Sequence, residues 1–318
     1  MTKKSSSIRW VVFALLPILY SRIINPADSL SMKANNDNDP KLFSQVSRRQ
    51  LLTWPIGAAG AVVYGKLVAD AVQKLSRGDL VYPDDHERRV ASTFSQAIVA
   101  AIPQDTGESR PLRVLEVGIG QQWRTQRRGL YKETLEQLGR RGLKNLHLTG
   151  VDIATPNEDT LQDVRRRFGG LDSSNGVQVD VNVVQDSITS GLAFSDGWFD
   201  CVICALTLCS VDDQDAALNE IKRLVRPDGG TFGYVEHVAV DPDEPYRLLS
   251  LQQEILDPLQ QIVAENCHLH RPTEENIALI FGAGGENKLA NRFGRERFLV
   301  DGMWPVSCQC CGVVQRTG

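Results

Sequence analysis

A short stretch of the chain limits its fold more than any other feature. Residues 112–120 read Leu-Arg-Val-Leu-Glu-Val-Gly-Ile-Gly, an apolar run that ends in two glycines. Such a run predicts a buried parallel strand that enters a tight turn and then a helix. Glycine lets the backbone come close to a bound group, and Glu116 adds a carboxylate just before the turn. We therefore expect an open α/β sheet with a ligand site at this turn.

The composition is typical of a globular domain and argues against a general nucleic-acid binder. The 318 residues leave room for one large domain or for one domain with an appendage, and 42% of the side chains are hydrophobic and 23% charged. The formal net charge of -4 provides no basic excess to meet phosphates. We expect no nucleic-acid partner.

Residues 1–78 are interpreted as a targeting region outside the fold. A basic start precedes an uncharged run over residues 10–20, the layout of a secretory signal peptide, and the polar stretch 21–47 has no apolar period. A twin-arginine pair at 48–49 then leads into a second uncharged run over 51–65. Small residues follow that run, as at signal-peptidase sites.

These two stacked signals predict a plastid protein directed to the thylakoid lumen or membrane. The alternative is that residues 51–72 form a membrane anchor or a helix at a membrane surface, at the endoplasmic reticulum or another membrane. Lys66 and Asp70 interrupt the run, which favours a cleaved or interfacial segment over a span. In both cases the folded domain is expected over residues 79–318.

Helical and strand patterns alternate through that domain. The spacing predicts helices over 84–103, 130–142, 159–168, 216–225 and 248–263, and strands over 112–117, 147–151, 177–184, 201–208 and 231–235. Pro258 is expected to break or kink the last of these helices. The basic segment 121–128 is expected to be a solvated face, with an anionic substrate or lipid headgroup as the alternative.

Acidic residues recur where the predicted strands end. Asp152 closes the second strand, where a carboxylate accepts hydrogen bonds from both hydroxyls of a ribose, although it could also cap the next helix. Asp186 repeats the pattern after the third strand. Together with Glu116, these acids favour a nucleotide-like ligand.

The order of these motifs resembles the class I S-adenosylmethionine-dependent methyltransferases. The likeness is carried by the glycine turn, Val151-Asp152, Gln185-Asp186, the stretch 199–204 and the turn 224–230. Residues 204–211 and 234–238 are most similar to the methyltransferase-like 7 group of membrane-associated thiol methyltransferases and to its plant and algal relatives. The resemblance covers the chain from about residue 80 to 316.

The resemblance implies a Rossmann-like sheet of seven strands, mostly parallel with the last strand antiparallel, and helices on both faces. Residues 298–314 would supply the reversed strand and its partner turn. S-adenosylmethionine would be the cofactor, and a small thiol or other lipophilic nucleophile would accept the methyl group by in-line transfer. Quinone-type or lipid acceptors, association with a membrane surface and the oligomeric state stay open.

The resemblance also implies a set of cofactor-binding residues at the carboxyl ends of four strands. They are Glu116, Gly118 and Gly120 for the methionine part, Asp152 for the ribose, Asp186 and Ser187 for the adenine, and the backbone of Ala205 and Leu206 for the sulfonium end.

One departure from the family pattern keeps other functions open. The first loop is long and has no third glycine, and Trp123 follows Gly120 by three positions. A dehydrogenase that uses a nicotinamide cofactor is disfavoured, because its fingerprint is Gly-x-Gly-x-x-Gly. A non-catalytic, membrane-associated or cofactor-sensing protein on the same fold is the remaining alternative.

Glu236 and His237 are the predicted catalytic residues. They end the fifth strand, where an acceptor would arrive, and a histidine can take a proton from a thiol or hydroxyl. The alternative for His237 is a hydrogen-bonded packing residue, and His268 is a second candidate.

Residues 308–311 read Cys-Gln-Cys-Cys, but no second cysteine pair or histidine cluster accompanies them. We therefore expect no bound metal.

Overall fold

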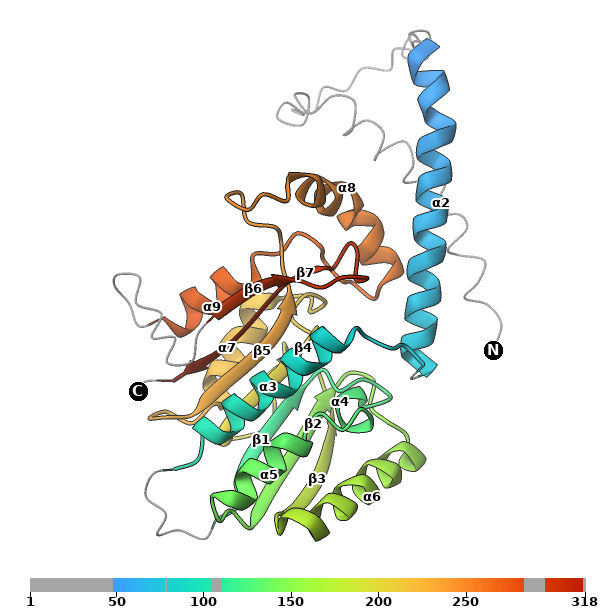
Figure 1. The fold of residues 1–318 in the computed structure, drawn as a ribbon. Helices are drawn as coiled ribbons and strands as arrows, with labels where there is room; N and C mark the ends of the chain where they lie inside the picture. Colours follow the sequence, from blue (N-terminus) through green and yellow to red (C-terminus); the bar gives the residue numbers. More distant parts are fainter. Residues whose placement is uncertain (1–47, 78, 104–109, 283–294, 317–318) are drawn as a thin grey trace.

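The protein folds around one seven-stranded sheet, shown in Figure 1. The computed structural model describes residues 48–77, 79–103, 110–282 and 295–316. The strands are β1 Leu112–Val117, β2 Asn145–Asp152, β3 Gln178–Gln185, β4 Cys201–Ala205, β5 Thr231–His237, β6 Arg295–Leu299 and β7 Cys308–Gln315. Their spatial order is β3-β2-β1-β4-β5-β7-β6, in which β1 to β5 pair in parallel and β7 runs antiparallel to both neighbours. The predicted fold class is confirmed.

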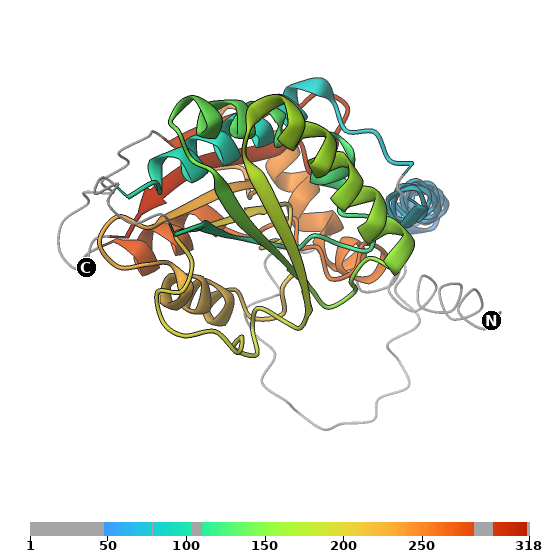
Figure 2. The same cartoon turned by 90° about the horizontal axis from the view of Figure 1, so that it is seen from below.

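Helices cover both faces of this sheet (Figure 2). The helices of the described residues are α2 Arg48–Arg77, α3 Asp84–Ala100, α4 Arg124–Arg127, α5 Lys132–Arg140, α6 Glu158–Asn175, α7 Gln214–Leu224, α8 Arg247–Val263 and α9 Thr273–Phe281. One face lies under α3, α5 and α6, and the other lies under α7 and α9. The parallel strands are therefore shielded on both sides, as βαβ connections require.

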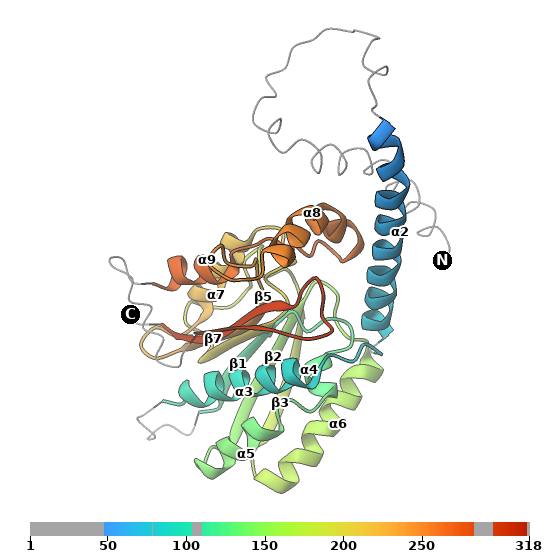
Figure 3. The same ribbon diagram turned by 45° about the horizontal axis from the view of Figure 1, so that its top comes forward.

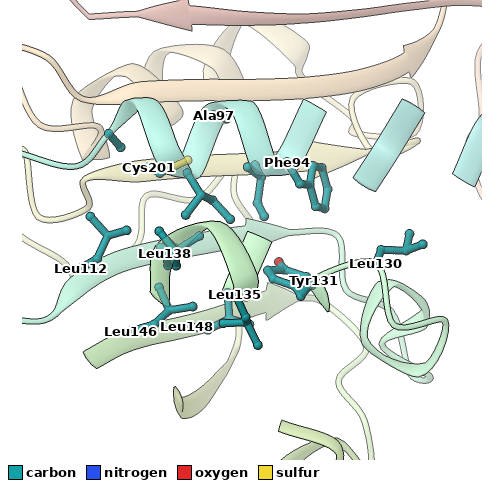
Figure 4. Close-up of a cluster of buried hydrophobic side chains, with 14 of the residues drawn as sticks. Phe94, Ala97, Leu112, Leu130, Tyr131, Leu135, Leu138, Leu146, Leu148 and Cys201 are labelled. Atoms are coloured by element: carbon teal, nitrogen blue, oxygen red, sulfur yellow. The ribbon is translucent and has the colours of Figure 1, made fainter. Parts of the chain in front are cut away.

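Strand β1 shows how the core fixes the turn that follows it. Side chains alternate along a strand, so Leu112 and Val114 pack with α3 and α5, while Leu115 packs toward α7. Figure 4 shows the first of these clusters, in which Phe94 and Leu135 are fully buried. Each such side chain stabilises the fold by about 1.5–3 kcal/mol. The carboxyl end of β1 is thus held in place from both faces.

Two predicted elements differ from the observed ones. The strand expected over 201–208 ends at Ala205, because Leu206 turns the backbone into the left-handed region with φ 53°. The helix over 248–263 does not break at Pro258, because α8 runs from Arg247 to Val263 with the proline inside it; a kink there stays a prediction. The predicted reversed strand and turn are a pair of antiparallel strands, β6 and β7.

The amino-terminal predictions are only partly within the described residues. The predicted signal peptide and polar stretch, residues 1–47, lie outside them. Helix α2 runs beside α8 (Figure 3), where the Tyr64 hydroxyl donates to Gln260 Oε1 at 2.5 Å and the Tyr64 ring packs edge-on against Trp304. Among the described helices, none has the length and apolarity needed to cross a membrane. The boundary near residue 79 and the plastid localisation stay predictions.

Candidate functional site

The sheet has its topological switch point between β1 and β4. Strands β2 and β3 lie on one side of β1, whereas β4 and β5 continue on the other. In open α/β sheets the ligand binds outside the carboxyl ends of the strands at such a point. The predicted cofactor-binding residues, Glu236 and His237 lie at this edge, on or just after β1 to β5, whereas His268 follows α8.

The turns after β1 and β4 touch each other at this point. Gly118 has a φ of 81°, and a side-chain carbon at its Cβ position would overlap the Thr207 side chain. The Thr207 hydroxyl donates to the carbonyl oxygens of Val117 and Ala205, both at 3.2 Å. Glycine is therefore required at 118 by conformation and by space, and Thr207 joins the two turns.

Glu236 fixes the turn after β4 from inside the protein. The Thr207 amide donates to both carboxylate oxygens of Glu236 at 3.0 Å, and the Cys204 thiol donates to Oε1 at 3.3 Å. The side chain is fully buried, and burial raises the pKa of its carboxyl, although these hydrogen bonds oppose the rise. The predicted catalytic residue Glu236 thus has the contacts of a positioning residue for Thr207.

Glu116 has a similar position under the turn after β1. Its carboxylate accepts hydrogen bonds from Trp123 Nε1 at 2.8 Å, Thr125 Oγ1 at 2.5 Å and the Tyr131 hydroxyl at 2.7 Å. The side chain is only 2% exposed, and burial raises the pKa of this carboxyl against the effect of the three donors. Glu116 therefore ties the long first loop and α5 to β1 from within the core.

The loop after Gly120 differs from the predicted helix start. Trp123 adopts φ 38° and buries its ring in the core, and only the four-residue helix α4 follows. The guanidinium of Arg124 stacks on the Tyr82 ring at 3.6 Å, and Arg128 pairs with Glu87 at 2.9 Å. The segment 121–128 is thus tied to α3 and to the residue Tyr82 before it through Arg128 and Arg124, and the prediction of a solvated face was wrong for these two arginines.

Asp152 lies beside the glycine turn with a half-buried carboxylate. Its Oδ2 accepts from the Gly120 amide at 2.8 Å, and its Oδ1 accepts from the Ala154 amide at 2.9 Å. Each oxygen retains acceptor capacity, since a carboxylate oxygen has two lone pairs. A side-chain carbon at Gly120 would meet nothing within 4 Å, so there is open space beside this carboxylate.

Asp186 and Ser187 follow β3 and organise their own turn. Asp186 Oδ1 accepts from the Ser187 amide at 2.7 Å and from the Ser190 hydroxyl at 3.2 Å. The Ser187 hydroxyl lies 2.8 Å from that of Thr189. Both predicted residues are half-buried at the carboxyl edge, next in order to Asp152.

His237 lies in a buried cluster with two cysteines that the sequence analysis did not connect to it. Cys267 Sγ is 4.0 Å from Nδ1 of His237 and 3.9 Å from Nε2, and Nε2 is 2.7 Å from the carbonyl oxygen of His268. The interaction with Cys209, and then the charge of His237, lower the pKa of Cys267 to about 4. Burial lowers the pKa of His237, but the Cys267 thiolate opposes this and raises it above its usual value. The three groups thus form one buried cluster whose members affect one another's pKa values.

Several residues that build this edge were missed by sequence reasoning. Thr207 follows a strand end that had been expected to continue, so its contact with Gly118 was hidden by the wrong boundary. Cys267 lies 58 positions from Cys209, and no local pattern links them. His268, the second catalytic candidate, contributes its carbonyl group to His237, and burial lowers the pKa of its own ring.

Parts of the chain are similar to known methyltransferases. A family described as "Methyltransferase domain" matches residues 129–232. The chain is 40% identical over 77 residues to thiol S-methyltransferase TMT1A of Homo sapiens, covering 24% of this chain and 30% of that protein. It is 32% identical over 112 residues to ubiquinone/menaquinone biosynthesis C-methyltransferase UbiE of Pasteurella multocida, covering 35% and 34%. The chain thus spans about a third of the length of the curated relatives it matches.

Solved methyltransferases also align with the chain. A SAM-dependent methyltransferase from Methanosarcina mazei covers 65% of this chain and 93% of its own, at 16% identity and a TM-score of 0.41. The family match includes Asp152, Asp186 and Ala205 and begins after the glycine turn. The family match and the curated relatives confirm the resemblance to methyltransferases over this part of the chain.

Proposed function

We propose that this chain, whose residues 129–232 match a methyltransferase family, transfers a methyl group from S-adenosylmethionine to the sulfur atom of a small thiol. The observation that carries the proposal is the switch point between β1 and β4, where the glycine turn, Asp152 and the β4 turn meet. Polar groups and a tight glycine turn at this place suit a nucleoside-bearing cofactor.

The residues at this edge fit S-adenosylmethionine in chemistry. The open space at Gly120 adjoins the Asp152 carboxylate, whose remaining lone pairs suit ribose hydroxyls. Following the resemblance, we assign the methionine part to the turn at Gly118 and Gly120 and the adenine to Asp186 and Ser187. The backbone of Ala205 and Leu206 would face the sulfonium end. Glu116 would act indirectly, because its carboxylate binds the loop that shapes the turn.

The cofactor supplies an activated methyl group on a positively charged sulfur. Transfer disperses that charge, so the protein contributes mainly by aligning the two reactants and keeping water away. Orientation of this kind can lower a barrier by about 7–11 kcal/mol in model reactions. Glu236 would contribute to this alignment by holding Thr207 against Gly118, where the turns after β1 and β4 meet.

The thiol acceptor is proposed from the relatives. Two of the curated matches are human proteins named thiol S-methyltransferase, TMT1A and TMT1B, and the second is 36% identical over 84 residues, covering 26% of this chain and 32% of that protein. The buried sulfur and imidazole groups at the end of β5 are compatible with a site that handles sulfur. A carbon acceptor is the competing class, because the match to UbiE is of similar extent.

An acceptor screen tests the proposal. The full chain would be incubated with S-adenosylmethionine and either small alkyl and aryl thiols or quinols, and the products identified by mass spectrometry. We expect S-methyl thioethers and an equal amount of S-adenosylhomocysteine. Methylation on carbon alone would contradict the thiol acceptor, and the absence of turnover with every acceptor would favour the non-catalytic alternative.

A further inference from the structure

Three buried side chains of different elements meet beyond the carboxyl end of β5. Cys209 lies in the segment between β4 and α7, His237 is the last residue of β5, and Cys267 follows α8. Their sulfur and ring-nitrogen atoms all lie within 4.8 Å of one another. Within residues 48–77, 79–103, 110–282 and 295–316, this is the one group of three or more His, Cys, Asp or Glu side chains close enough to hold a metal ion.

The orientation of His237 is that of a metal ligand. Its Nε2 lies 2.7 Å from the carbonyl oxygen of His268, and a carbonyl only accepts, so Nε2 carries the hydrogen. In the neutral ring, Nδ1 then has a free lone pair, and it lies 4.0 Å from Cys267 Sγ. Histidines that bind metals usually donate their other ring N–H to a carbonyl or carboxylate, which fixes the tautomer and the ring.

The distances between the three ligand atoms and the hydrogen bonds around them also suit a soft divalent ion. Two ligands of a tetrahedral zinc ion, at their usual bond lengths, lie about 3.6–3.8 Å apart. The Cys267 sulfur is 4.0 Å from Nδ1, and all three ligand atoms lie within 4.8 Å of one another, so they would move inward by up to about 1 Å to reach that spacing. Gln260 donates to the Cys267 sulfur at 3.4 Å and is itself held by the Tyr64 hydroxyl of α2. Such outer hydrogen bonds orient the ligands of zinc sites.

We propose that Cys209, His237 and Cys267 bind one zinc ion and leave its fourth position open to the sulfur of the acceptor. Structural zinc sites are closed by four protein ligands, whereas sites with three protein ligands keep a position for a reactant. Thiolate and imidazole ligands favour zinc over magnesium or calcium. The assignment of the open position rests on the proposed thiol methyltransferase function, while the ion site itself does not.

The step that follows is balanced without an oxidant or reductant. The acceptor thiol loses its proton to solvent when its sulfur binds the ion. A lone pair of that sulfur forms the new bond to the methyl carbon. The bond between this carbon and the sulfonium sulfur breaks, and its electron pair stays on the departing S-adenosylhomocysteine.

Metal titration of the reduced full chain tests the site. The protein would be stripped with a chelator under argon and titrated with Co²⁺ and Zn²⁺, with cobalt followed by its thiolate charge-transfer absorption and zinc by elemental analysis. We expect one ion per chain and loss of the absorption in Cys267→Ser. Cys311→Ser is the matched control, because it removes a half-buried cysteine of β7 outside the cluster and is expected to bind normally.

A second variant separates metal binding from failure to fold. Gln260→Ala keeps all three ligands and removes the hydrogen bond to the Cys267 sulfur, so we expect about 10–100-fold weaker zinc binding at unchanged stoichiometry. Absence of the cobalt–thiolate band in wild-type protein with a native circular dichroism spectrum would overturn the site. A Cys209–Cys267 disulfide that resists dithiothreitol would overturn it as well.

The role of the ion in the reaction has its own test. If wild-type protein transfers methyl groups to thiols, we expect chelation to abolish that activity and zinc to restore it, while calorimetric binding of S-adenosylmethionine persists. Activity that survives complete chelation would overturn the acceptor role. Stoichiometric zinc binding in a protein that methylates no thiol would support the ion site and contradict the proposed acceptor.

Discussion

The two halves of the sheet's carboxyl edge are built in different ways. On the β1–β3 side, Asp152 and Asp186 are half-buried, and each accepts hydrogen bonds from backbone amides nearby. On the β4–β5 side, Glu236 and His237 are at most 2% exposed, and they are held by the Thr207 amide and the His268 carbonyl oxygen. The carboxylates on the β1–β3 side can still accept further hydrogen bonds. On the β4–β5 side, Glu236 and His237 instead contact cysteine sulfur atoms and the amide of a turn. We infer that the first side recognises the cofactor and the second shapes the place where chemistry occurs.

Glu116 is the exception on the first side and provides the largest expected effect. Replacing it by alanine in Glu116→Ala would leave the Trp123, Thr125 and Tyr131 donors buried without their acceptor. We expect the free energy of unfolding to fall by about 3–5 kcal/mol, as measured by urea denaturation. Glu116→Gln retains an acceptor oxygen and should lose clearly less. Equal losses in the two variants would contradict the assignment of Glu116 as a hydrogen-bonded core residue.

The difference between the two sides also explains what the sequence could predict. The strand at 112–117, the glycine turn and the acids after β2 and β3 are local patterns, because each depends on residues within a few positions. The sheet order and the reversed β7 followed from the family resemblance of these local motifs. In contrast, the Cys209–His237–Cys267 cluster depends on where the segment after α8 packs, and no short pattern encodes that.

Two predictions from local sequence patterns were wrong for the same physical reason. The strand at 201–208 continues as an apolar run, but Glu236 binds the Thr207 amide and draws the backbone into a turn. The segment 121–128 is basic and reads as solvated, but Glu87 and Tyr82 at the start of α3 provide partners for its arginines. In both cases a tertiary contact overrides the local signal.

The packing of α3 against β7 is expected to depend on pH. His86 is fully buried, stacks on Tyr82 and shares a hydrogen bond of 2.8 Å between its Nδ1 and Gln309 Oε1, while its Nε2 is buried without a partner. Burial lowers the pKa of His86 from 6.5 to about 4, aided by the charge of Arg124, while the Gln309 hydrogen bond and Asp85 oppose the shift.

The sign of the effect follows from these two values. Between pH 6.5 and about 4 the unfolded chain binds a proton at this position and the folded chain does not. The contribution of neutral His86 to the free energy of unfolding is therefore complete above pH 6.5. It is lost as the pH falls from 6.5 to about 4, by up to about 3 kcal/mol. The difference in urea-derived stability between wild type and His86→Gln should shrink as the pH falls to 4. A difference that does not vary with pH would contradict the prediction.

Gly118 and Gly120 lie in the same turn but are expected to tolerate alanine differently. Both have positive φ values, 81° and 60°, but only at Gly118 does the Thr207 side chain occupy the space that a Cβ atom would need. We expect Gly118→Ala to cost about 2–4 kcal/mol of stability and Gly120→Ala about 1 kcal/mol, the price of a left-handed conformation alone. Thermal or urea unfolding of both variants would test the difference. Equal costs would mean that the two turns are not in contact.

Replacing Asp152 should cause a small loss of stability and a large loss of cofactor binding. Its carboxylate is half-buried and accepts two backbone amides, so Asp152→Ala should reduce the free energy of unfolding by about 1 kcal/mol, as for a lost capping interaction. Asp159→Ala at the start of α6 is a matched control with the same change of charge. A stability loss as large as that of Glu116→Ala would contradict the contrast between a ligand-facing and a core carboxylate.

The central claim is that the edge at β1 and β2 binds S-adenosylmethionine. Isothermal titration calorimetry of the full chain tests it most directly, with S-adenosylmethionine and S-adenosylhomocysteine as ligands. We predict saturable binding of both to wild type, retained affinity in Asp159→Ala, and an affinity at least about tenfold lower in Asp152→Ala, which corresponds to 1.4 kcal/mol. Absence of binding in folded wild-type protein, or unchanged affinity in Asp152→Ala, would contradict the account.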